Sequence, residues 1–333
     1  MDLTGLIEDW LSWLLMNKGR SPATIIKYRG YLNIFKEHLG DSQIVDVDLD
    51  LLEDFSGKVL FDKGLASRSR SAAVSSIKNF FSWLKLKNII SSDPSDKLAH
   101  PSIGRRLPKA ITLQDAEKLI GATDLDTFIG VRDAAMMSLL IGCGLRVSGL
   151  CNLNQSNLMF TQDNEGRERL VIRAIEKGNK ERLVPAPTEC LLLIRAYIGH
   201  RELDVIDTSL PSGDKVLFVS VRNRTIPEHE YHGERRRFAP RSVNDMLAKY
   251  AKETGVSVAF AHPHALRHLY GAELMESDVN ILSAQALLGH ESADTTAIYS
   301  HLAMRKLTKD VDRANPLGKM HTPVTDLIPH LNG

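Results

Sequence analysis

The sequence predicts a mainly helical protein with a small β-sheet, an α+β chain of two domains. Apolar residues recur at spacings of three and four through most of its 333 residues, which is the period of a helix with one buried face. Between Arg169 and Pro185 the apolar residues instead form short β-rich runs. Between Pro94 and Pro108 the helical pattern stops, so we expect a boundary between the two domains there.

The N-terminal part is expected to be a small helical bundle. Apolar stripes at helical spacing cover residues 3–15 and 25–39. A glycine follows each stripe, Gly19 and then Gly40, and glycine is the usual residue just past the end of a helix. Ser21 stands before the second stripe as an N-cap.

Two further helices are expected in the same bundle, capped by Asp50 and Ser67. Together the four helices make residues 1–95 one domain. The inward-facing residues of the last two helices are Leu51, Leu52, Phe55, Val59, Val74, Ile77, Phe81 and Leu84.

Residues 96–110 read as an exposed linker, because proline and glycine interrupt the pattern and Arg105 and Arg106 make the stretch basic. The second domain is expected over residues 111–314. The last residues, 315–333, contain prolines and glycines and are expected to form a mobile tail.

The second domain should begin with a helix capped by Thr112 and a buried apolar helix over residues 133–141. The β-rich runs at residues 170–172 and 183–184 predict a hairpin. Its turn is expected at or near residues 178–179, a Gly-Asn pair.

The rest of this domain is expected to be largely helical. A helix is predicted over residues 191–198 and a short buried strand over 216–219. The polar residues 222–241 read as a loop, Ser242 as the cap of the next helix, and 263–311 as a run of helices.

Composition excludes several classes of protein. The longest apolar run, residues 134–145, is shorter than the roughly 20 residues of a membrane helix. Asp2, Glu8 and Asp9 stand where a signal peptide carries positive charge, so we expect a cytoplasmic protein. The formal net charge of +1 decides little, because an average can hide a basic face.

The three cysteines contain no CxxC pair and are expected to be buried, reduced residues. They are Cys143, Cys151 and Cys190.

Six residues in the second domain suit chemistry on a phosphodiester, which needs cations around its oxygens and a proton for the leaving group. Arginine is the best cation for this task because it binds two oxygens at once. The six residues are Arg146, Lys177, His264, Arg267, His290 and Tyr299.

Local sequence indicates how these residues are presented. Arg146 follows a glycine-rich break and should start a short helix. His264 and Arg267 lie three apart on a helix and share one face. Lys177 sits at the hairpin tip, where an ammonium can donate a proton. His290 follows a helix that ends at a glycine, and so lies on a loop.

Tyr299 is the nucleophile candidate, on a helix capped by Asp294 or Thr295. A phenol with a pKa of about 10 needs nearby cations and a base to attack at neutral pH. Taken singly, each of the six also has an ordinary interpretation as a solvated charge or a packed side chain. Their combination is what points to phosphoryl transfer.

Five segments in this order resemble the tyrosine recombinase (phage integrase) family over nearly the whole chain. They are residues 144–148 (GLRVS), 176–185 (EKGNKERLVP), 264–268 (HALRH), 287–290 (LLGH) and 295–301 (TTAIYSH). Residues 21–28 and 68–81 are similar to the helical core-binding domain of that family. The resemblance implies a core-binding domain, a linker and a catalytic domain.

The resemblance also implies roles for the six residues. Tyr299 would attack DNA and leave a 3′-phosphotyrosine, while Arg146, Arg267 and His290 hold the phosphate oxygens. Lys177 would protonate the leaving oxygen and His264 would assist the tyrosine. Strand exchange would pass through a Holliday junction with no cofactor and no metal.

The implied partner is double-stranded DNA with paired inverted half-sites, bound by a homotetramer that forms through the C-terminal helix, with possible accessory proteins. The implied task is integration or excision of a mobile element, or replicon resolution, in a prokaryotic nucleoid. In the first domain, we expect five residues to contact DNA, and high salt to weaken those contacts. They are Thr24, Lys27, Arg68, Arg70 and Lys78.

Two features depart from the family pattern. Gly149 stands where such enzymes usually have an acidic residue, three positions after the first arginine, and we expect activity to survive this change in reduced form. The polar stretch 204–241 is longer than in the plainest members, either for a DNA feature or partner, or as a tolerated insertion.

Other interpretations remain open from sequence. His262, His264 and His268 are close enough for a zinc site, but they lack the glutamate of HExxH. Gly149 leaves room for a DNA-binding protein that has lost catalysis, and a topoisomerase shares the covalent chemistry. The amphipathic residues 302–311 can pack either on a neighbouring protomer or on their own domain.

Overall fold

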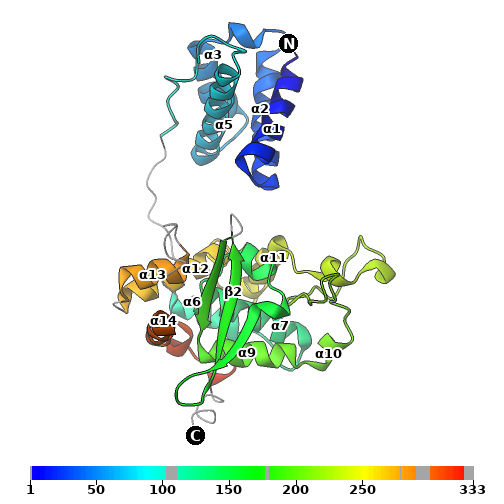
Figure 1. Ribbon diagram of the computed structural model, residues 1–333, viewed down its shortest axis with the longest axis vertical. Coiled ribbons are helices and arrows are strands. Elements are labelled where there is room, and N and C mark those ends of the chain that lie inside the picture. The colour runs from blue at the N-terminus through cyan, green and yellow to red at the C-terminus, as the bar shows by residue number, and fades with distance from the viewer. Residues whose placement is uncertain (1, 103–110, 177–179, 278, 290–300, 326–333) are drawn as a thin grey trace. The chain divides into compact units, whose positions relative to one another are not determined.

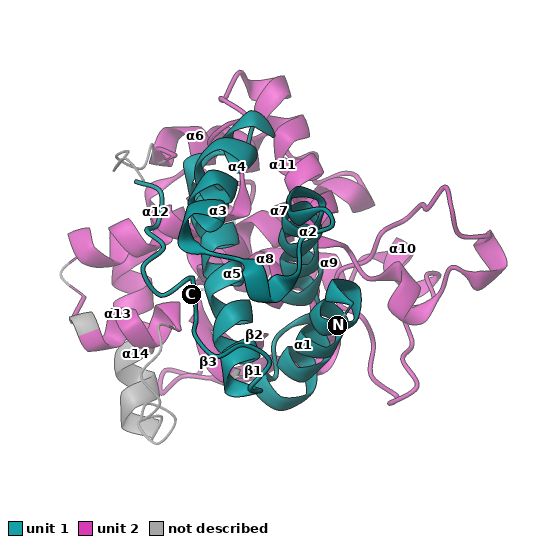
Figure 2. Ribbon diagram, turned by 90° about the horizontal axis from the view of Figure 1, so that it is seen from above, with its two compact units in different colours: residues 1–107 teal, residues 108–333 magenta. Residues whose placement is uncertain are grey.

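The computed structural model describes residues 2–102, 111–176, 180–277, 279–289 and 301–325, and of residues 176, 180, 281 and 301–307 it describes the backbone alone. The chain divides into two compact units, residues 1–107 and 108–333, coloured separately in Figure 2. Each unit has its own apolar core, as expected for a chain of this length.

The first unit is helical where it is described. Aromatic side chains fill its core: Trp10 packs edge-on to Phe80, and Phe35 packs in the same way against Phe55 and Phe81. Its helices in Figure 1 are α1 (Leu3–Lys18), α2 (Pro22–Leu39), α3 (Leu49–Asp54), α4 (Leu60–Asp62) and α5 (Ser67–Leu86), with a π-helical turn at Phe55–Val59.

Two of the expected caps in this unit were wrong by one or two residues. Asp48, and not Asp50, caps α3, because its carboxylate accepts the backbone N–H of Leu51 at 2.9 Å. Ala66 occupies the cap position of α5, and Ser67 is the first helical residue. Of the inward residues expected in the last two helices, Leu51 and Val59 are half-buried and the others are buried, whereas Leu15, at the end of the expected stripe of α1, is exposed.

The second unit contains helices and a small sheet (Figure 1). Helix α7 lies at its centre, and nearly all of its residues are buried. The described helices are α6 (Leu113–Gly121), α7 (Phe128–Gly142), α8 (Val147–Cys151), α9 (Thr188–Ile198), α10 (Arg201–Asp204), α11 (Pro240–Thr254), α12 (Pro263–Glu276), α13 (Ile281–Leu288) and α14 (His301–Ala314).

In the described residues, the sheet has three antiparallel strands in the order β1 (Leu158–Gln162), β2 (Glu168–Glu176) and β3 (Lys180–Ala186). The β2–β3 hairpin confirms the sequence prediction, although the proposed turn residues lie outside the described part of the chain. Strand β1 was not predicted. It is an edge strand whose residues are half-buried or exposed, and its short apolar run, residues 158–160, was not interpreted as a strand.

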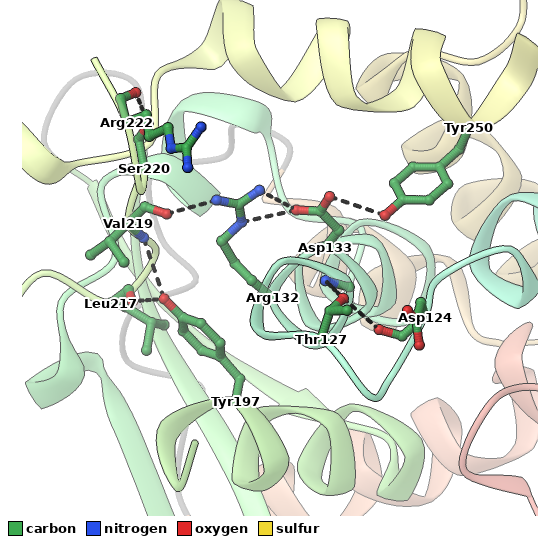
Figure 3. A network of polar contacts seen from close by, with 11 residues as sticks. Asp124, Thr127, Arg132, Asp133, Tyr197, Leu217, Val219, Ser220, Arg222 and Tyr250 are labelled. Atoms are coloured by element: carbon green, nitrogen blue, oxygen red, sulfur yellow. Dashed lines mark hydrogen bonds and ion pairs between the residues drawn. The ribbon is translucent and has the colours of Figure 1, made fainter. Parts of the chain in front are cut away.

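Residues 216–219 are fully buried but do not form the predicted strand. They make only single bridges, Val216 to Asn154 and Val219 to Arg237. A polar network holds this segment against α7 (Figure 3). Arg132 donates to the Val219 carbonyl at 3.0 Å, and the Tyr197 hydroxyl donates to the Leu217 carbonyl at 2.8 Å.

The same network contains a buried ion pair. Arg132 binds Asp133 through Nε and Nη2, at 2.9 and 2.6 Å, and the Tyr250 hydroxyl lies 3.2 Å from the other carboxylate oxygen. Burial raises the pKa of Asp133, and the guanidinium of Arg132 opposes that rise. The network therefore joins α7, α11 and residues 216–219.

Three more expectations need correction. Helix α11 begins at Pro240 with Ala239 as its cap, so Ser242 is already inside it. The helix expected to end before His290 has Leu282 among the apolar residues that predict it, but the Leu282 side chain is exposed. Residues 315–325, expected to be a mobile tail, pack on the second unit: Leu317 and Met320 are buried.

The three cysteines are buried and reduced, as expected. Among the described residues, no helix is both long and apolar enough to cross a membrane.

Candidate active site

Arg146 stands at the N-cap of α8, directly after the turn that ends α7. Gly144 makes this turn with a φ of +57°, in the left-handed region. A Cβ at this position would lie 2.3 Å from the Tyr270 ring, so the close approach of α12 also requires glycine. The predicted break and short helix are therefore confirmed.

Arg267 extends from α12 into the interior, where it is 8% exposed. Its guanidinium donates to the Gly144 carbonyl and to the Leu288 carbonyl. Leu266 and Tyr270 are buried and anchor the helix on its other side. Arg267 is thus fixed to the turn that carries Arg146.

Arg146 reaches the same place from the other direction. Its Nη2 donates to the Gly289 carbonyl at 3.2 Å, one residue beyond the carbonyl that Arg267 contacts. Helix α13 ends there, and its last carbonyls carry partial negative charge. The structure therefore brings the two predicted arginines together at the C-terminal end of α13.

Arg182 is a third cation at this end of α13, and the sequence prediction did not include it. It lies on β3 and donates to the Leu287 carbonyl. Burial, followed by the charges of Arg182 and Arg146, lowers the pKa of Arg267 to about 9, so Arg267 stays cationic at neutral pH. The available signal was strand alternation, because Arg182 shares the inward face of β3 with Val184 and Ala186.

His264 and His268 are exposed one turn apart on α12, with their Nε2 atoms 2.9 Å apart. Burial, then the neighbouring His268, His262 and Arg267, lowers the pKa of His264. This shift favours the neutral form of the His264 imidazole. A neutral imidazole can accept a proton.

Lys177, His290 and Tyr299 lie outside the described residues. The chain positions around them are described. Strands β2 and β3 end on either side of Lys177, and Gly289, with a left-handed φ of +61°, closes α13 just before His290. Of the six candidate residues, the structure therefore describes three: Arg146, His264 and Arg267.

Two features noted in the sequence can be placed in the second unit. Gly149 is buried within α8. In the described part of the chain, no group of three histidine, cysteine or acidic residues is arranged to hold a metal ion.

The polar residues 220–237 are mostly exposed, and several of their charges pair with one another. Arg235 pairs with Glu230, and Arg237 pairs with Glu234 at 2.6 Å. Arg237 also donates to the Cys151 carbonyl at the end of α8, at 3.0 Å. The base of this segment is therefore attached to the second unit.

In the first unit, Thr24 and Lys27 line a hollow of about 410 Å³ between α2 and α5. The Lys27 ammonium lies 5.8 Å from the centre of the Tyr31 ring. Thr24 also contacts the capping residue Ser21, with the two hydroxyl oxygens 2.9 Å apart.

The other three candidates of this unit lie on α5. Arg68 is exposed, and Arg70 lies over the Phe61 ring. Lys78 donates to the carbonyls of Asp96 and Leu98, at 3.1 and 3.0 Å. Lys78 thus holds the segment that leaves α5.

Comparison with known proteins gives matches to both units. The profile described as the phage integrase family matches residues 109–306, and that of the phage integrase N-terminal SAM-like domain matches residues 7–88. Tyrosine recombinase XerD of Pseudomonas putida is 31% identical over 315 residues, which cover 94% of this chain and 98% of the relative. Tyrosine recombinase XerC of Thermodesulfovibrio yellowstonii is 30% identical over 315 residues, 94% of this chain and 97% of the relative.

The fold is shared with solved integrases. A lambda integrase dimer crystallised on a COC′ core site superposes with a TM-score of 0.63 and 18% identity, covering 89% of this chain and 97% of that one. The helical first unit and the mixed second unit agree with this architecture. Since the profile spans well over half of the chain and relatives aligned over nearly their whole length are about 30% identical, the chain belongs to the phage integrase family and is a tyrosine recombinase, an enzyme that breaks and rejoins DNA.

Proposed function

We propose that this enzyme is a site-specific recombinase that works through a 3′-phosphotyrosine intermediate and a Holliday junction, with neither ATP nor a metal ion. One observation carries the proposal. Arg146 and Arg267 come from elements far apart in sequence and converge on the carbonyls of Gly289 and Leu288, the two residues that precede His290 in the sequence. A paired guanidinium site of this kind suits the oxygens of a phosphodiester.

In the proposed reaction, the Tyr299 hydroxyl attacks the phosphorus and forms a tyrosyl phosphate bond, while the bond to the 5′-oxygen breaks. Arg146, Arg267 and His290 stabilise the charge on the non-bridging oxygens. His264 accepts the phenolic proton, and its lowered pKa favours the neutral form that this step needs. Lys177 gives a proton to the leaving 5′-oxygen.

The second half of the reaction reverses the first. The 5′-hydroxyl of another strand attacks the phosphotyrosine and releases Tyr299, so the number of phosphodiester bonds is conserved and no external energy source is needed. Two rounds on paired strands give exchange through a Holliday junction. The biological task is integration or excision of a mobile element, or resolution of a replicon.

The proposed partner is duplex DNA with paired inverted half-sites. Relatives support this choice, because the lambda integrase structure holds a core site and a XerH structure holds its difH substrate. Thr24, Lys27, Arg68, Arg70 and Lys78 are proposed to contact that DNA. The hollow beside Thr24 and Lys27 favours those two.

A homotetramer is proposed on DNA, formed through the C-terminal helix, with accessory proteins where the site requires them. In the described residues α14 also contacts its own unit. Val311 and Ala314 are buried, and Arg169 pairs with Asp312 at 3.0 Å. The end of α14 that contains Val311, Asp312 and Ala314 is thus held by its own unit. The part of the chain that packs on a neighbouring protomer would therefore be the residues that precede this end.

The test begins with a duplex selected from a randomised pool by its retention on the protein. A nick is placed near each candidate cleavage position, so that the short 5′-hydroxyl fragment is lost and the covalent intermediate accumulates. Wild type is expected to give a band on a denaturing gel that carries both protein and DNA, with EDTA present. Tyr299→Phe is expected to give none, although it still retains the duplex.

The same substrates separate recombination from relaxation alone. Exchange of strands between two labelled duplexes supports the recombinase. Relaxation of a supercoiled plasmid with no exchange product would instead favour a topoisomerase. Retention of DNA by wild type without any adduct would point to a DNA-binding protein that has lost catalysis.

A further inference from the structure

Arg182 is a charged residue in an apolar position. It faces inward from β3, opposite Ala174 of β2, and only 8% of it is exposed. Removing a guanidinium from water costs several kcal/mol, and an apolar side chain of similar size would avoid that cost. An arginine in this position therefore calls for a specific contact.

That contact is with the end of α13. Arg182 donates to the Leu287 carbonyl, Arg267 to the Leu288 carbonyl and Arg146 to the Gly289 carbonyl. Three successive carbonyls each accept one guanidinium. A helix C-terminus favours such donors, because its last carbonyls have no partner within the helix.

The three arginines come from three different elements. Arg146 caps α8, Arg267 lies on α12, and Arg182 lies on the strand that leads back from the hairpin tip. Arg182 therefore links that hairpin to the turn that ends α13. In the proposed function, the hairpin tip carries the general acid Lys177, and the turn leads to His290.

We infer that Arg182 is a positioning residue for cleavage. It fixes the end of α13 through the Leu287 carbonyl, and so holds the phosphate-binding arginines and the hairpin in fixed positions relative to one another. This inference rests on the proposed function. Arg182 acts through the backbone of α13 and not on the phosphate itself. The residue is identified by its place in the fold, since neither its spacing from Lys177 nor its charge singles it out.

The experiment measures single-turnover cleavage of the selected nicked duplex at saturating protein. Arg182→Met is expected to lower the cleavage rate by about 100-fold, the usual cost of misplacing a reacting group by about 1 Å, while the Kd for the duplex stays unchanged. Arg182→Lys keeps one donor and is expected to recover part of the rate. A weaker Kd with an unchanged rate would overturn the inference.

Arg132→Lys is the matched control for loss of fold. Arg132 is 6% exposed and also donates to a backbone carbonyl, that of Val219, but it lies in a different network. Arg182→Lys should cleave more slowly than Arg132→Lys even when their melting temperatures are equal. Equal cleavage rates at equal stability would mean that Arg182 only stabilises the fold. This comparison remains decisive if Arg182→Met does not fold.

A neutral substrate separates positioning from direct contact with the phosphate. A methylphosphonate at the scissile position removes the negative charge that a phosphate-binding arginine would neutralise. If Arg182 is a positioning residue, Arg182→Met should lower the cleavage rate by the same factor on both substrates. A cleavage rate of Arg182→Met that returns to the wild-type rate on the methylphosphonate would overturn the positioning role. If wild type forms no adduct on the ordinary phosphodiester duplex, the proposed function is wrong and this inference fails with it.

Discussion

At the residue scale, the active site depends on one glycine. Gly144 has a left-handed backbone, leaves room for the Tyr270 ring and accepts a hydrogen bond from the guanidinium of Arg267. We predict that Gly144→Ala lowers the free energy of unfolding by about 3 kcal/mol, from backbone strain and overpacking together. Urea denaturation of the purified protein measures this change.

Gly166→Ala is the control for that prediction. Gly166 also has a left-handed φ, +78°, but its Cβ would meet open space. Its substitution should lower the free energy of unfolding only through the strain of a left-handed backbone, by about 1 kcal/mol. If the two variants lose equal stability, the close approach of Tyr270 is not what requires Gly144.

The pH dependence of cleavage should report the environment of His264. Its pKa is lowered from 6.5 by burial and by His268, His262 and Arg267, the titratable and charged groups that face it in the described chain. As the proton acceptor, His264 is active when neutral, so cleavage should fall as the pH is lowered, with a midpoint below 6.5. His268→Asn removes one cause of the lowering, and the acid limb should move to higher pH.

Single-turnover rates across the acid range test this shift. His229→Asn is the control, since His229 lies in an exposed turn of the second unit. An acid limb that stays in place in His268→Asn, or moves to lower pH, would contradict the assignment of His264 as the base.

Residue identities in the site could be predicted only in part. Arg146, His264 and Arg267 were recognisable from motif order, but the burial of Arg267 and its contact with Gly144 were not. Arg182 was missed, because its signal is the contrast between its charge and an inward strand position. That contrast appears only once the strand register is known.

At the scale of elements, apolar periodicity predicted most helices correctly: α1 and α2 end at the expected glycines, Gly19 and Gly40, and α6 has its expected N-cap, Thr112. Cap positions failed where two candidates stood close together, as with Asp48 and Asp50. Strand β1 was missed although residues 158–160 are apolar, because a run of three is too short to indicate a strand by itself. Residues 216–219 are apolar because they are buried, and not because they pair in a sheet.

The network that holds residues 216–219 makes its own prediction. Arg132→Met leaves Asp133 buried without its cation, and we expect a loss of about 3 to 5 kcal/mol in the free energy of unfolding. Adding Asp133→Leu should recover part of this loss, because the unpaired carboxylate is removed. Urea denaturation of both variants measures it.

Arg167→Met is the surface control for the ion pair. Arg167 is exposed and pairs with Asp163 at 3.0 Å, so its loss should lower the free energy of unfolding far less than the loss of Arg132. If Arg132→Met lowers the free energy of unfolding no more than Arg167→Met does, the buried ion pair does not hold residues 216–219 in place.

At the scale of the whole molecule, DNA binding should weaken with salt despite a net charge of only +1. Phosphate binding releases counterions, so removing one phosphate-binding cation should reduce the slope of log K against log salt by about 1. We predict this for Lys27→Gln and Arg68→Gln. Lys63→Gln is the control, because Lys63 pairs with Glu37 at 3.1 Å. An unchanged slope in the first two variants would contradict DNA binding by these side chains.

The central claim is that the described arginine pair and Tyr299 serve one phosphoryl-transfer reaction. The most direct measurement digests the covalent adduct with nuclease and protease and identifies the modified residue by mass spectrometry. We predict a nucleotide attached through its 3′-phosphate to Tyr299, and almost no adduct in Arg146→Ala or Arg267→Ala. A nucleotide on any other residue, or undiminished adduct in the arginine variants, would contradict the claim.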